Sequence, residues 1–151
     1  GVLIDLHHRA LGDRAATGAL RITDHKTGRP LESTPASIAG GKVLQPVLYA
    51  LAAEKMLGAK AEWGRLWYCT QRGNYTEYNI AIDARARQRF HMAMQLMDEA
   101  IATGFLPAAP AKDACSLCEF RPVCGPNEEV RVKRWKNGEA LDRLNELRSL
   151  P

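Results

Sequence analysis

The sequence has no long hydrophobic run, although 46% of its 151 residues are hydrophobic. Because a membrane-spanning helix needs about 18 or more consecutive apolar residues, we expect no transmembrane segment. No basic and then apolar leader is in view at the start, so we expect a cytoplasmic protein. Internal repeats and low-complexity tracts are lacking too, and the hydrophobic content predicts a globular domain with its own core.

Acidic residues are the scarcer charged group, with 17 Asp and Glu against 21 Lys and Arg, which gives a net charge of +4. The isoelectric point of about 9.0 fits an anionic partner. A basic balance alone does not establish nucleic-acid binding, because many basic surfaces are only solvated faces. The motifs therefore have to decide the function.

Apolar periodicity predicts an α/β fold with the element order β-β-α-β-β-α, followed by a cysteine segment and a helical tail. Strand-like alternation predicts a β-hairpin first, with its turn at 12–18, and a second pair of strands later. The predicted strands span residues 2–9, 19–26, 65–70 and 76–82. The predicted helices span residues 42–57, 84–103, 126–136 and 138–148, with Gly58 ending the first and Asp83 capping the second.

Two units follow from this order: we expect residues 1–110 to form the core, and residues 111–151 to form a cysteine module with a helical tail. The residues from Gly1 to Leu6 already have the pattern of a strand. We therefore expect an N-terminal part of the core to be missing.

Asp24, His25 and Lys26 stand at the end of the second predicted strand. Side chains alternate across a strand, so Asp24 and Lys26 share a face while His25 points away. A carboxylate can hold the hard cation Mg²⁺, and a neighbouring ammonium can orient water and stabilise charge that develops on phosphorus. We expect both side chains to be directed to solvent. The simpler alternative is a surface salt pair, because short motifs have many false positives.

Asp5 lies on the neighbouring strand of the hairpin and is the natural second ligand, because one carboxylate holds Mg²⁺ poorly. We expect Asp5, Asp24 and Lys26 to converge on one pocket at the edge of the sheet. His7 shares a strand face with Asp5 and could approach the metal, although such a histidine is more often satisfied by a neighbouring residue.

A larger pattern surrounds the Asp-His-Lys tripeptide. Thr27 and Gly28 follow directly, so D-H-K-T-G comes after an upstream G-x-x-I-D strand, and Gln45 and Tyr49 lie four residues apart on one helix face. Together these residues resemble the RecB-like branch of the PD-(D/E)XK nuclease superfamily, where G-x-I-D and D-x-K-T-G precede a helix with Q-x-x-x-Y. The resemblance implies a restriction-endonuclease-like core, in which a mixed sheet is flanked by helices.

The resemblance also implies a role for each matching residue. Asp5 and Asp24 would be ligands of Mg²⁺ or Mn²⁺, with the main-chain carbonyl of His25 as a further ligand. Lys26 would be the catalytic lysine. The helix residues of the pattern would border the site and help to position DNA or the catalytic groups: Gln45 and Tyr49.

The sequence has only four cysteines, and three of them are clustered as Cys115, Cys118 and Cys124. Without a secretion signal, this C-x-x-C-x5-C spacing indicates a metal or cluster site more than disulfides. Thiolates at this density suit an iron–sulfur cluster or zinc, and a set of structural thiols is the plainer alternative. Cys69 lies in the middle of a strand pattern, and we expect it to be a buried core residue.

The cysteine spacing, with Phe120, Pro122 and Gly125 around it, resembles the C-terminal cysteines of iron–sulfur nucleases. These include AddB-type helicase–nuclease subunits and CRISPR-associated RecB-like exonucleases. The resemblance implies a [4Fe-4S] cluster on the three cysteines, with the fourth ligand upstream of Gly1. It also implies a helicase or a CRISPR-associated protein as a partner.

The motifs favour a nuclease that hydrolyses DNA phosphodiester bonds, as an exonuclease on single strands or ends, in DNA repair, recombination or CRISPR processing. The alternative from another class is a non-catalytic domain that holds nucleic acid or a partner protein beside a structural metal cluster. A zinc-binding interaction module would leave the coincidence of motifs unexplained. Several aromatic residues could stack on bases, although at strand spacing most are better explained as core or rim: Trp63, Trp67, Tyr68, Tyr75 and Tyr78.

Overall fold

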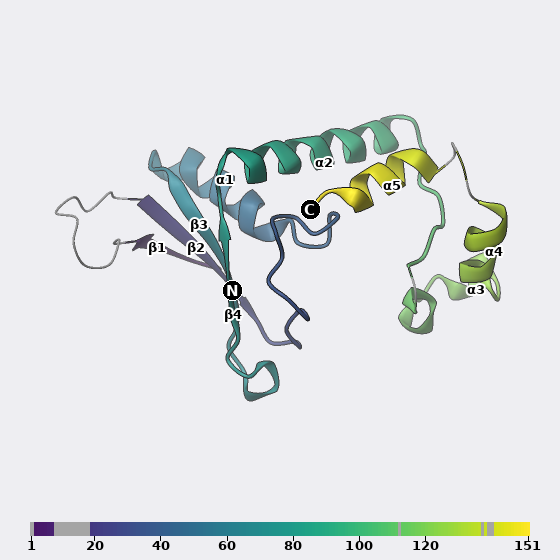
Figure 1. Ribbon diagram of the computed structural model, residues 1–151, viewed down its shortest axis with the longest axis horizontal. Helices are drawn as coiled ribbons and strands as arrows, with labels where there is room; N and C mark the ends of the chain where they lie inside the picture. The colour runs from purple at the N-terminus through teal and green to yellow at the C-terminus, as the bar shows by residue number, and fades with distance from the viewer. Residues whose placement is uncertain (1, 8–18, 112, 137, 139–140) are drawn as a thin grey trace.

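The computed structural model describes residues 2–7, 19–111, 113–136, 138 and 141–151, with side chains from residue 19 onward apart from Leu117. Its centre is a mixed four-stranded sheet with the order β1-β2-β3-β4 (Figure 1). The strands are β1 (Val2–His7), β2 (Ala19–Lys26), β3 (Ala61–Tyr68) and β4 (Glu77–Ala81). The β1–β2 and β3–β4 pairs are antiparallel, whereas β2 and β3 are parallel. The predicted hairpin and α/β class are confirmed, and the turn at 12–18 lies outside the described residues.

Helix α1 (Gln45–Leu57) makes the crossover between the parallel strands β2 and β3 and packs on both of them. Pro46 is accepted in its first turn, where the missing N–H leaves no hydrogen bond unmade. Gly58 ends the helix in the left-handed conformation, with φ of 66°. A Cβ atom at Gly64 of β3 would lie 2.6 Å from the Pro46 Cβ, so this glycine lets α1 approach the sheet closely.

Helix α2 (Ala84–Ala102) follows β4 and begins at Asp83, whose side chain accepts a hydrogen bond of 2.8 Å from the Ala86 N–H. This cap is the one predicted from the sequence. The core between α1, α2 and the sheet consists mainly of aliphatic residues, many of them small or β-branched; its members include Leu20, Ile22, Ile38, Val47, Ala50, Ile82, Phe90 and Ala93. None of the helices in the described ranges has both the length and the apolar character that crossing a bilayer requires.

Strand β3 shows where the sequence interpretation fell short, because it begins at Ala61 rather than at the predicted residue 65. Gly64 stands in its interior, and its outer face carries Trp63 and Trp67 as well as Arg65, which hides the alternation on which strand prediction depends. The C-terminal helices also differ in extent: α4 spans Glu128–Trp135 and α5 spans Asp142–Ser149. Two short elements, η2 (Ala114–Leu117) and α3 (Arg121–Cys124), lie within the cysteine segment.

The last residues of the chain fix the loop between β2 and α1. Helix α5 runs beside α2 (Figure 1), and the Pro151 carbonyl accepts hydrogen bonds from the Ile38 N–H at 3.1 Å and the Ser37 hydroxyl at 2.5 Å. The Gly40 N–H donates to the Leu150 carbonyl at 2.7 Å. A loop that follows the Asp-His-Lys strand is therefore held by residues more than a hundred positions away in sequence.

We predict that Gly40→Ala destabilises the fold more than Gly58→Ala, although both glycines have left-handed φ angles, of 64° and 66°. A Cβ at Gly40 would lie 2.7 Å from the Arg148 carbonyl oxygen, whereas a Cβ at Gly58 meets nothing within 4 Å. The Gly58 variant should lose about 1 kcal/mol of unfolding free energy from backbone strain alone. The Gly40 variant should lose a further 1–3 kcal/mol, roughly, from overpacking. Equal losses in urea denaturation would contradict the docking of the C-terminal residues.

Glu54 of α1 and Arg87 of α2 tie the two helices and the start of β3 together. The Arg87 guanidinium donates to both Glu54 carboxylate oxygens, at 2.6 and 2.7 Å, and the Ala61 N–H donates to the same carboxylate at 2.7 Å. The two side chains are only 20% and 26% exposed. The Arg87 hydrogen bonds lower the pKa of Glu54 below its ordinary value of 4.5.

We predict that Glu54→Gln lowers the unfolding free energy at pH 7 by about 1–3 kcal/mol, the usual contribution of a hydrogen bond to a charged group. Since the folded-state pKa of Glu54 is depressed, its contribution is fully present above pH 4.5 and is lost as the pH falls through the folded pKa. The stability difference between wild type and variant should therefore shrink on acidification below pH 4.5. A difference that grows in acid would contradict this assignment.

Candidate active site

The sheet brings Asp24 and Lys26 together, as their spacing on one strand predicted. Both lie at the C-terminal end of β2, and the Lys26 Nζ is 2.8 Å from the Asp24 Oδ2. His25 contacts Trp67, the residue beside it on β3, with ring centroids 5.3 Å apart. Because side chains alternate along β2, the Asp24–Lys26 pair lies on one face of the sheet and the contact of His25 with Trp67 lies on the other.

Asp24 is buried, with 7% of the residue exposed, so the expectation that its side chain is directed to solvent is wrong. The physical reason is its position: β2 is an interior strand between β1 and β3, and α1 covers the face on which Ile22 and Asp24 lie. The Lys26 side chain is 30% exposed. In a simple surface salt pair both side chains would be exposed. Here the carboxylate is buried and only the ammonium reaches solvent.

The Asp24 Oδ2 has no aligned hydrogen-bond partner in the described part of the chain, although the Lys26 Nζ lies within ion-pairing distance. The Lys26 ammonium offsets part of the cost of burying this charged oxygen, and a further hydrogen-bond donor or a cation would offset more of it. A hard divalent cation would satisfy this oxygen, because Mg²⁺ prefers carboxylate ligands. Asp24 therefore fits a metal site in the chemistry of its donor atom. Within the described residues, no three His, Cys, Asp or Glu side chains gather to complete such a site.

Asp5 is placed here by its backbone alone. The register pairs Asp5 with Arg21 and Val2 with Asp24, so Asp5 lies three positions along the ladder from Asp24. Three positions correspond to about 10 Å, and an odd offset assigns the two residues to opposite faces of the sheet. This register does not itself bring Asp5 to Asp24, and the shared metal site remains a prediction. His7, at the end of β1, pairs with Ala19 and is equally a prediction.

Gln45 and Tyr49 lie in the first half of α1, the helix that packs on β2 and β3. Both are half-buried, and Tyr49 packs against the main hydrophobic core. Their spacing places them on one face of the helix, as predicted. Their proposed border position beside Asp24 remains a prediction, as does a metal contact of the His25 carbonyl.

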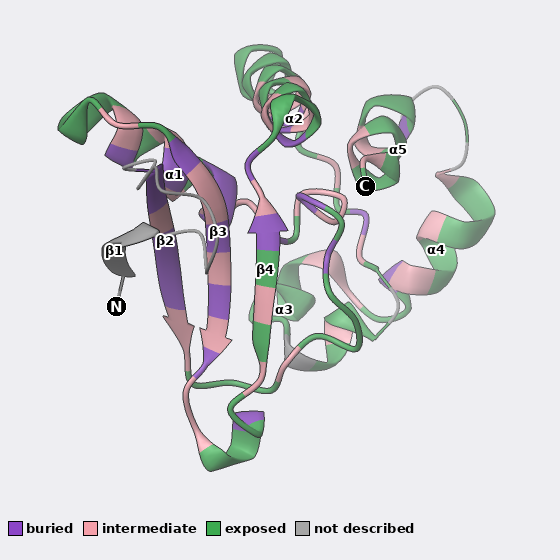
Figure 2. Cartoon of the chain, turned by 60° about the vertical axis from the view of Figure 1, so that its left-hand side comes forward, coloured by how far each residue is buried: buried purple, intermediate pink, exposed green. Residues whose placement is uncertain are grey.

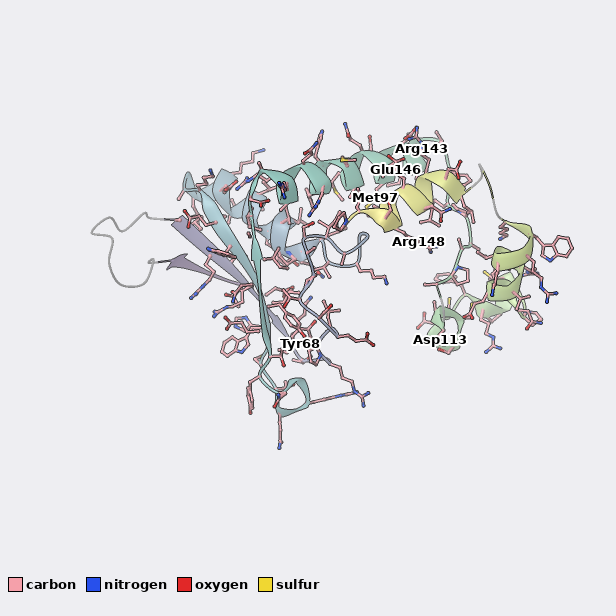
Figure 3. The ribbon with its side chains drawn as sticks, in the orientation of Figure 1. Tyr68, Met97, Asp113, Arg143, Glu146 and Arg148 are labelled. Carbon is pink, nitrogen blue, oxygen red and sulfur yellow. The ribbon has the colours of Figure 1, made fainter. Side chains whose placement is uncertain are left out.

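Two residues beside Lys26 were not assigned to the site from the sequence. Tyr68 pairs with Lys26 across the parallel ladder, is buried, and packs edge-on against Tyr78 with ring centroids 5.9 Å apart (Figure 3). The Cys69 N–H donates to the Lys26 carbonyl at 3.1 Å, and its thiol lies 3.6 Å from the same oxygen. Cys69 is half-buried and lies just past the end of β3, so the expectation of a buried core cysteine is wrong. The parallel β2–β3 register would have identified both.

The opposite face of the sheet carries its own polar network. The Arg65 Nε donates to the Thr23 hydroxyl at 3.0 Å, and its guanidinium lies 5.4 Å from the Trp67 ring centroid. Arg65 also pairs with Glu77 at 3.2 Å. A hollow of about 550 Å³ on this side is lined by Arg21, Trp63 and Asn79 among others. These contacts support the interpretation of Trp67 as a structural residue, away from Asp24.

The cysteine segment lies apart from the sheet, at the far right of Figure 1. Helix α4 holds both of its ends: the Cys115 N–H donates to Glu129 at 3.2 Å, and the Arg131 guanidinium donates to the Cys124 carbonyl. Glu128 is 4% exposed and pairs with Arg131 and with Lys136, whose Nζ is 2.5 Å away. The Lys136 hydrogen bond, more than any other contact, lowers the pKa of Glu128.

All three clustered cysteines are free thiols, and Cys118 is exposed. A hollow of about 250 Å³ is lined by Cys115, Arg121 and Glu129 among others. Burial, followed by the neighbouring Glu129 carboxylate, raises the pKa of the Cys115 thiol. Because a metal ligand must be the thiolate, binding here would release a proton. Three thiols are suitable ligands for a soft metal. Among the described residues, however, they are not close enough together to form a metal site.

A family model described as the PD-(D/E)XK nuclease superfamily matches residues 10–125, which is well over half of the chain. The match includes the Asp-His-Lys strand, the crossover helix α1 and the cysteine segment. A search of curated proteins finds no match to this sequence. Together with the mixed sheet and its paired Asp24 and Lys26, the match defines the class: the chain belongs to the PD-(D/E)XK nuclease superfamily.

Proposed function

We propose that this chain carries the catalytic residues of a nuclease that uses Mg²⁺ or Mn²⁺ to hydrolyse phosphodiester bonds in DNA. The observation that supports it most strongly is the Asp24–Lys26 pair, in which a buried carboxylate oxygen lacks a hydrogen bond beside an ammonium at 2.8 Å. Membership of a nuclease superfamily supports the same class of substrate. Single strands or DNA ends are the proposed substrates, with roles in repair, recombination or CRISPR processing and a helicase or CRISPR-associated partner.

Each residue of the pattern has a proposed role. Hydrolysis adds water across one P–O bond: the water oxygen bonds to phosphorus, and a proton ends on the leaving oxygen. The Lys26 ammonium can orient that water and stabilise the charge that develops on the phosphoryl oxygens, because it reaches solvent while its pair remains buried. Asp24 would hold the metal with the His25 carbonyl as a further ligand, and Asp5, three ladder positions away in this register, would have to move toward Asp24 to join them. When bound, the metal supplies electrostatic stabilisation of the phosphoryl group and a more acidic water.

Gln45 and Tyr49 complete the proposal as residues that orient DNA or the catalytic groups from α1. The alternative is a non-catalytic domain of the same fold that only binds nucleic acid or a partner. The presence together of Asp5, Asp24 and Lys26 argues against a loss of catalysis, although the lysine would also pair with the buried aspartate in a non-catalytic domain. The alternative therefore predicts binding without cleavage, and the two can be separated by experiment.

We predict that Asp24→Asn or Lys26→Ala lowers metal-dependent cleavage of labelled DNA by about 10²–10³-fold or more, the usual cost of losing one stabilising group in such a site. Asparagine keeps the size of Asp24, so the fold should survive, and circular dichroism checks this. Asp98→Asn, at an exposed position on α2, is the matched control and should cleave normally. Undiminished cleavage by Asp24→Asn would remove the hypothesis, and binding without any cleavage by the wild type would favour the alternative.

We further propose a [4Fe-4S] cluster on Cys115, Cys118 and Cys124, with a fourth ligand that these three do not supply. Three thiolates within ten residues give the soft donor set that such clusters require. The clamping of Cys115 and Cys124 to one helix through Glu129 and Arg131 supports a structural role for the bound group. Its distance from the sheet in Figure 1 likewise favours a structural over a catalytic role.

We predict that the complete protein, purified without oxygen, is brown, absorbs near about 400 nm and contains about four iron atoms per chain. Cys115→Ser or Cys124→Ser should lose the iron and the colour. Cys69→Ser is the control, since Cys69 lies at the end of β3, and it should keep both. One zinc per chain with no iron would show that the cluster assignment is wrong and leave the nuclease proposal intact.

A further inference from the structure

The turn between β3 and β4 extends the sheet at the end where Lys26 lies. It comprises residues 69–76 with a short helix η1 (Gln71–Gly73), and Figure 2 shows it projecting past the arrowheads of β2 and β3. Its first residue, Cys69, donates its N–H to the Lys26 carbonyl at 3.1 Å. The turn therefore adjoins the end of β2 that carries the candidate site.

Hydrogen bonds and close packing hold the turn in one conformation. The Thr70 hydroxyl accepts from the Gly73 N–H at 3.1 Å, and the Thr70 carbonyl accepts from the Tyr75 N–H at 3.2 Å. A Cβ at Gly73 would lie 2.7 Å from the Cβ of Tyr68, the ladder partner of Lys26. The turn is thus packed directly against the residue beside the candidate catalytic lysine, and its geometry is coupled to the site.

Tyr75 at the tip of this turn is both strained and exposed. Asn74 and Tyr75 have positive φ angles of 50° and 49°. Asparagine tolerates this conformation, whereas a bulky side chain adopts it rarely. The Tyr75 residue is nevertheless 63% exposed, so burial of its ring does not offset the strain. Backbone strain of this kind clusters at functional sites, which indicates a function for the exposed ring.

The turn itself carries positive charge only. Arg72 is exposed on it, residues 69–76 contain no acidic side chain, and Glu77 just past it is paired with Arg65 at 3.2 Å. The loop that follows β2 carries both charges, with Arg29 and Glu32 exposed. Proteins bind single-stranded nucleic acid with this combination: cationic groups contact phosphates, and an exposed aromatic ring stacks on a base.

We propose that Tyr75 is a stacking platform for one base of a single strand that leads into the Asp24–Lys26 site, and that Arg72 contacts a phosphate of the same strand. This inference rests on the proposed nuclease function. It adds that the substrate is single-stranded where it passes the turn between β3 and β4. Tyr75 acts here as a binding residue, and it takes no part in bond cleavage.

The test compares Tyr75→Gly, Tyr75→Phe and Trp135→Ala in the complete protein, with a labelled single-stranded oligonucleotide as the probe. Glycine removes the ring and also relieves the backbone strain, so the thermal stability should stay equal or rise while KM and Kd increase about tenfold. Phenylalanine keeps the ring and should bind as the wild type does. Trp135, which is 79% exposed on α4, is the control for an unspecific aromatic contact and should have no effect.

An abasic nucleotide placed in turn at each position of the oligonucleotide locates the stacked base. At one position it should weaken binding to the wild type about tenfold and leave binding to Tyr75→Gly unchanged, because the stack is already lost. Equal affinities of the wild type and Tyr75→Gly, with cleavage intact, would overturn the inference and spare the nuclease proposal. A wild type that cleaves no nucleic acid, yet binds the strand through Tyr75, would overturn the nuclease proposal and support the stacking site.

Discussion

The candidate site depends on keeping one carboxylate, that of Asp24, inside a sheet beside a lysine. A buried charge is tolerated only when it is paired or coordinated, and Asp24 has an ion pair at 2.8 Å but no aligned hydrogen bond. Burial follows from the topology: β2 is flanked by β1 and by a parallel β3, and parallel strands require a crossover. That crossover is α1, so the element that buries Asp24 also carries Gln45 and Tyr49.

The C-terminal residues help to hold the loop that follows the Asp24–Lys26 strand. The loop that joins β2 to α1 has hydrogen bonds of its own around Ile38, and Pro151, Leu150 and the close approach of Arg148 to Gly40 also hold it in place. Helix α5 in turn packs beside α2, and the cysteine segment is tied to α4 just before it. Helix α5 therefore joins the C-terminal part of the chain to the core through α2, while the cysteine segment and α4 lie apart from the sheet. The division into residues 1–110 and 111–151 remains a prediction.

The sequence predicted the elements whose reasons are local, and it failed where the reason is a neighbour distant in sequence. The Asp83 cap, the Gly58 stop and the shared face of Asp24 and Lys26 follow from residues close together in the chain. The burial of Asp24 depends on β3 and α1, which pattern alone does not pair with it. The start of β3 was hidden because Gly64 serves the packing of Pro46 and breaks the alternation. The left-handed conformation of Tyr75 leaves no mark in the sequence except the preceding glycine and asparagine.

Under the proposed function, the fold also keeps two kinds of metal chemistry apart. Carboxylate and carbonyl oxygens near Asp24 suit hard cations such as Mg²⁺, whereas the thiols of Cys115, Cys118 and Cys124 suit iron–sulfur clusters or zinc. A thiol among the oxygen ligands would favour soft transition metals over Mg²⁺. Divalent transition metals already bind a given site more tightly along the first row, up to copper. Cys69, the cysteine nearest to Lys26, directs its thiol to the Lys26 carbonyl, at 3.6 Å. That contact directs the thiol just past the end of β3 toward the main chain of Lys26.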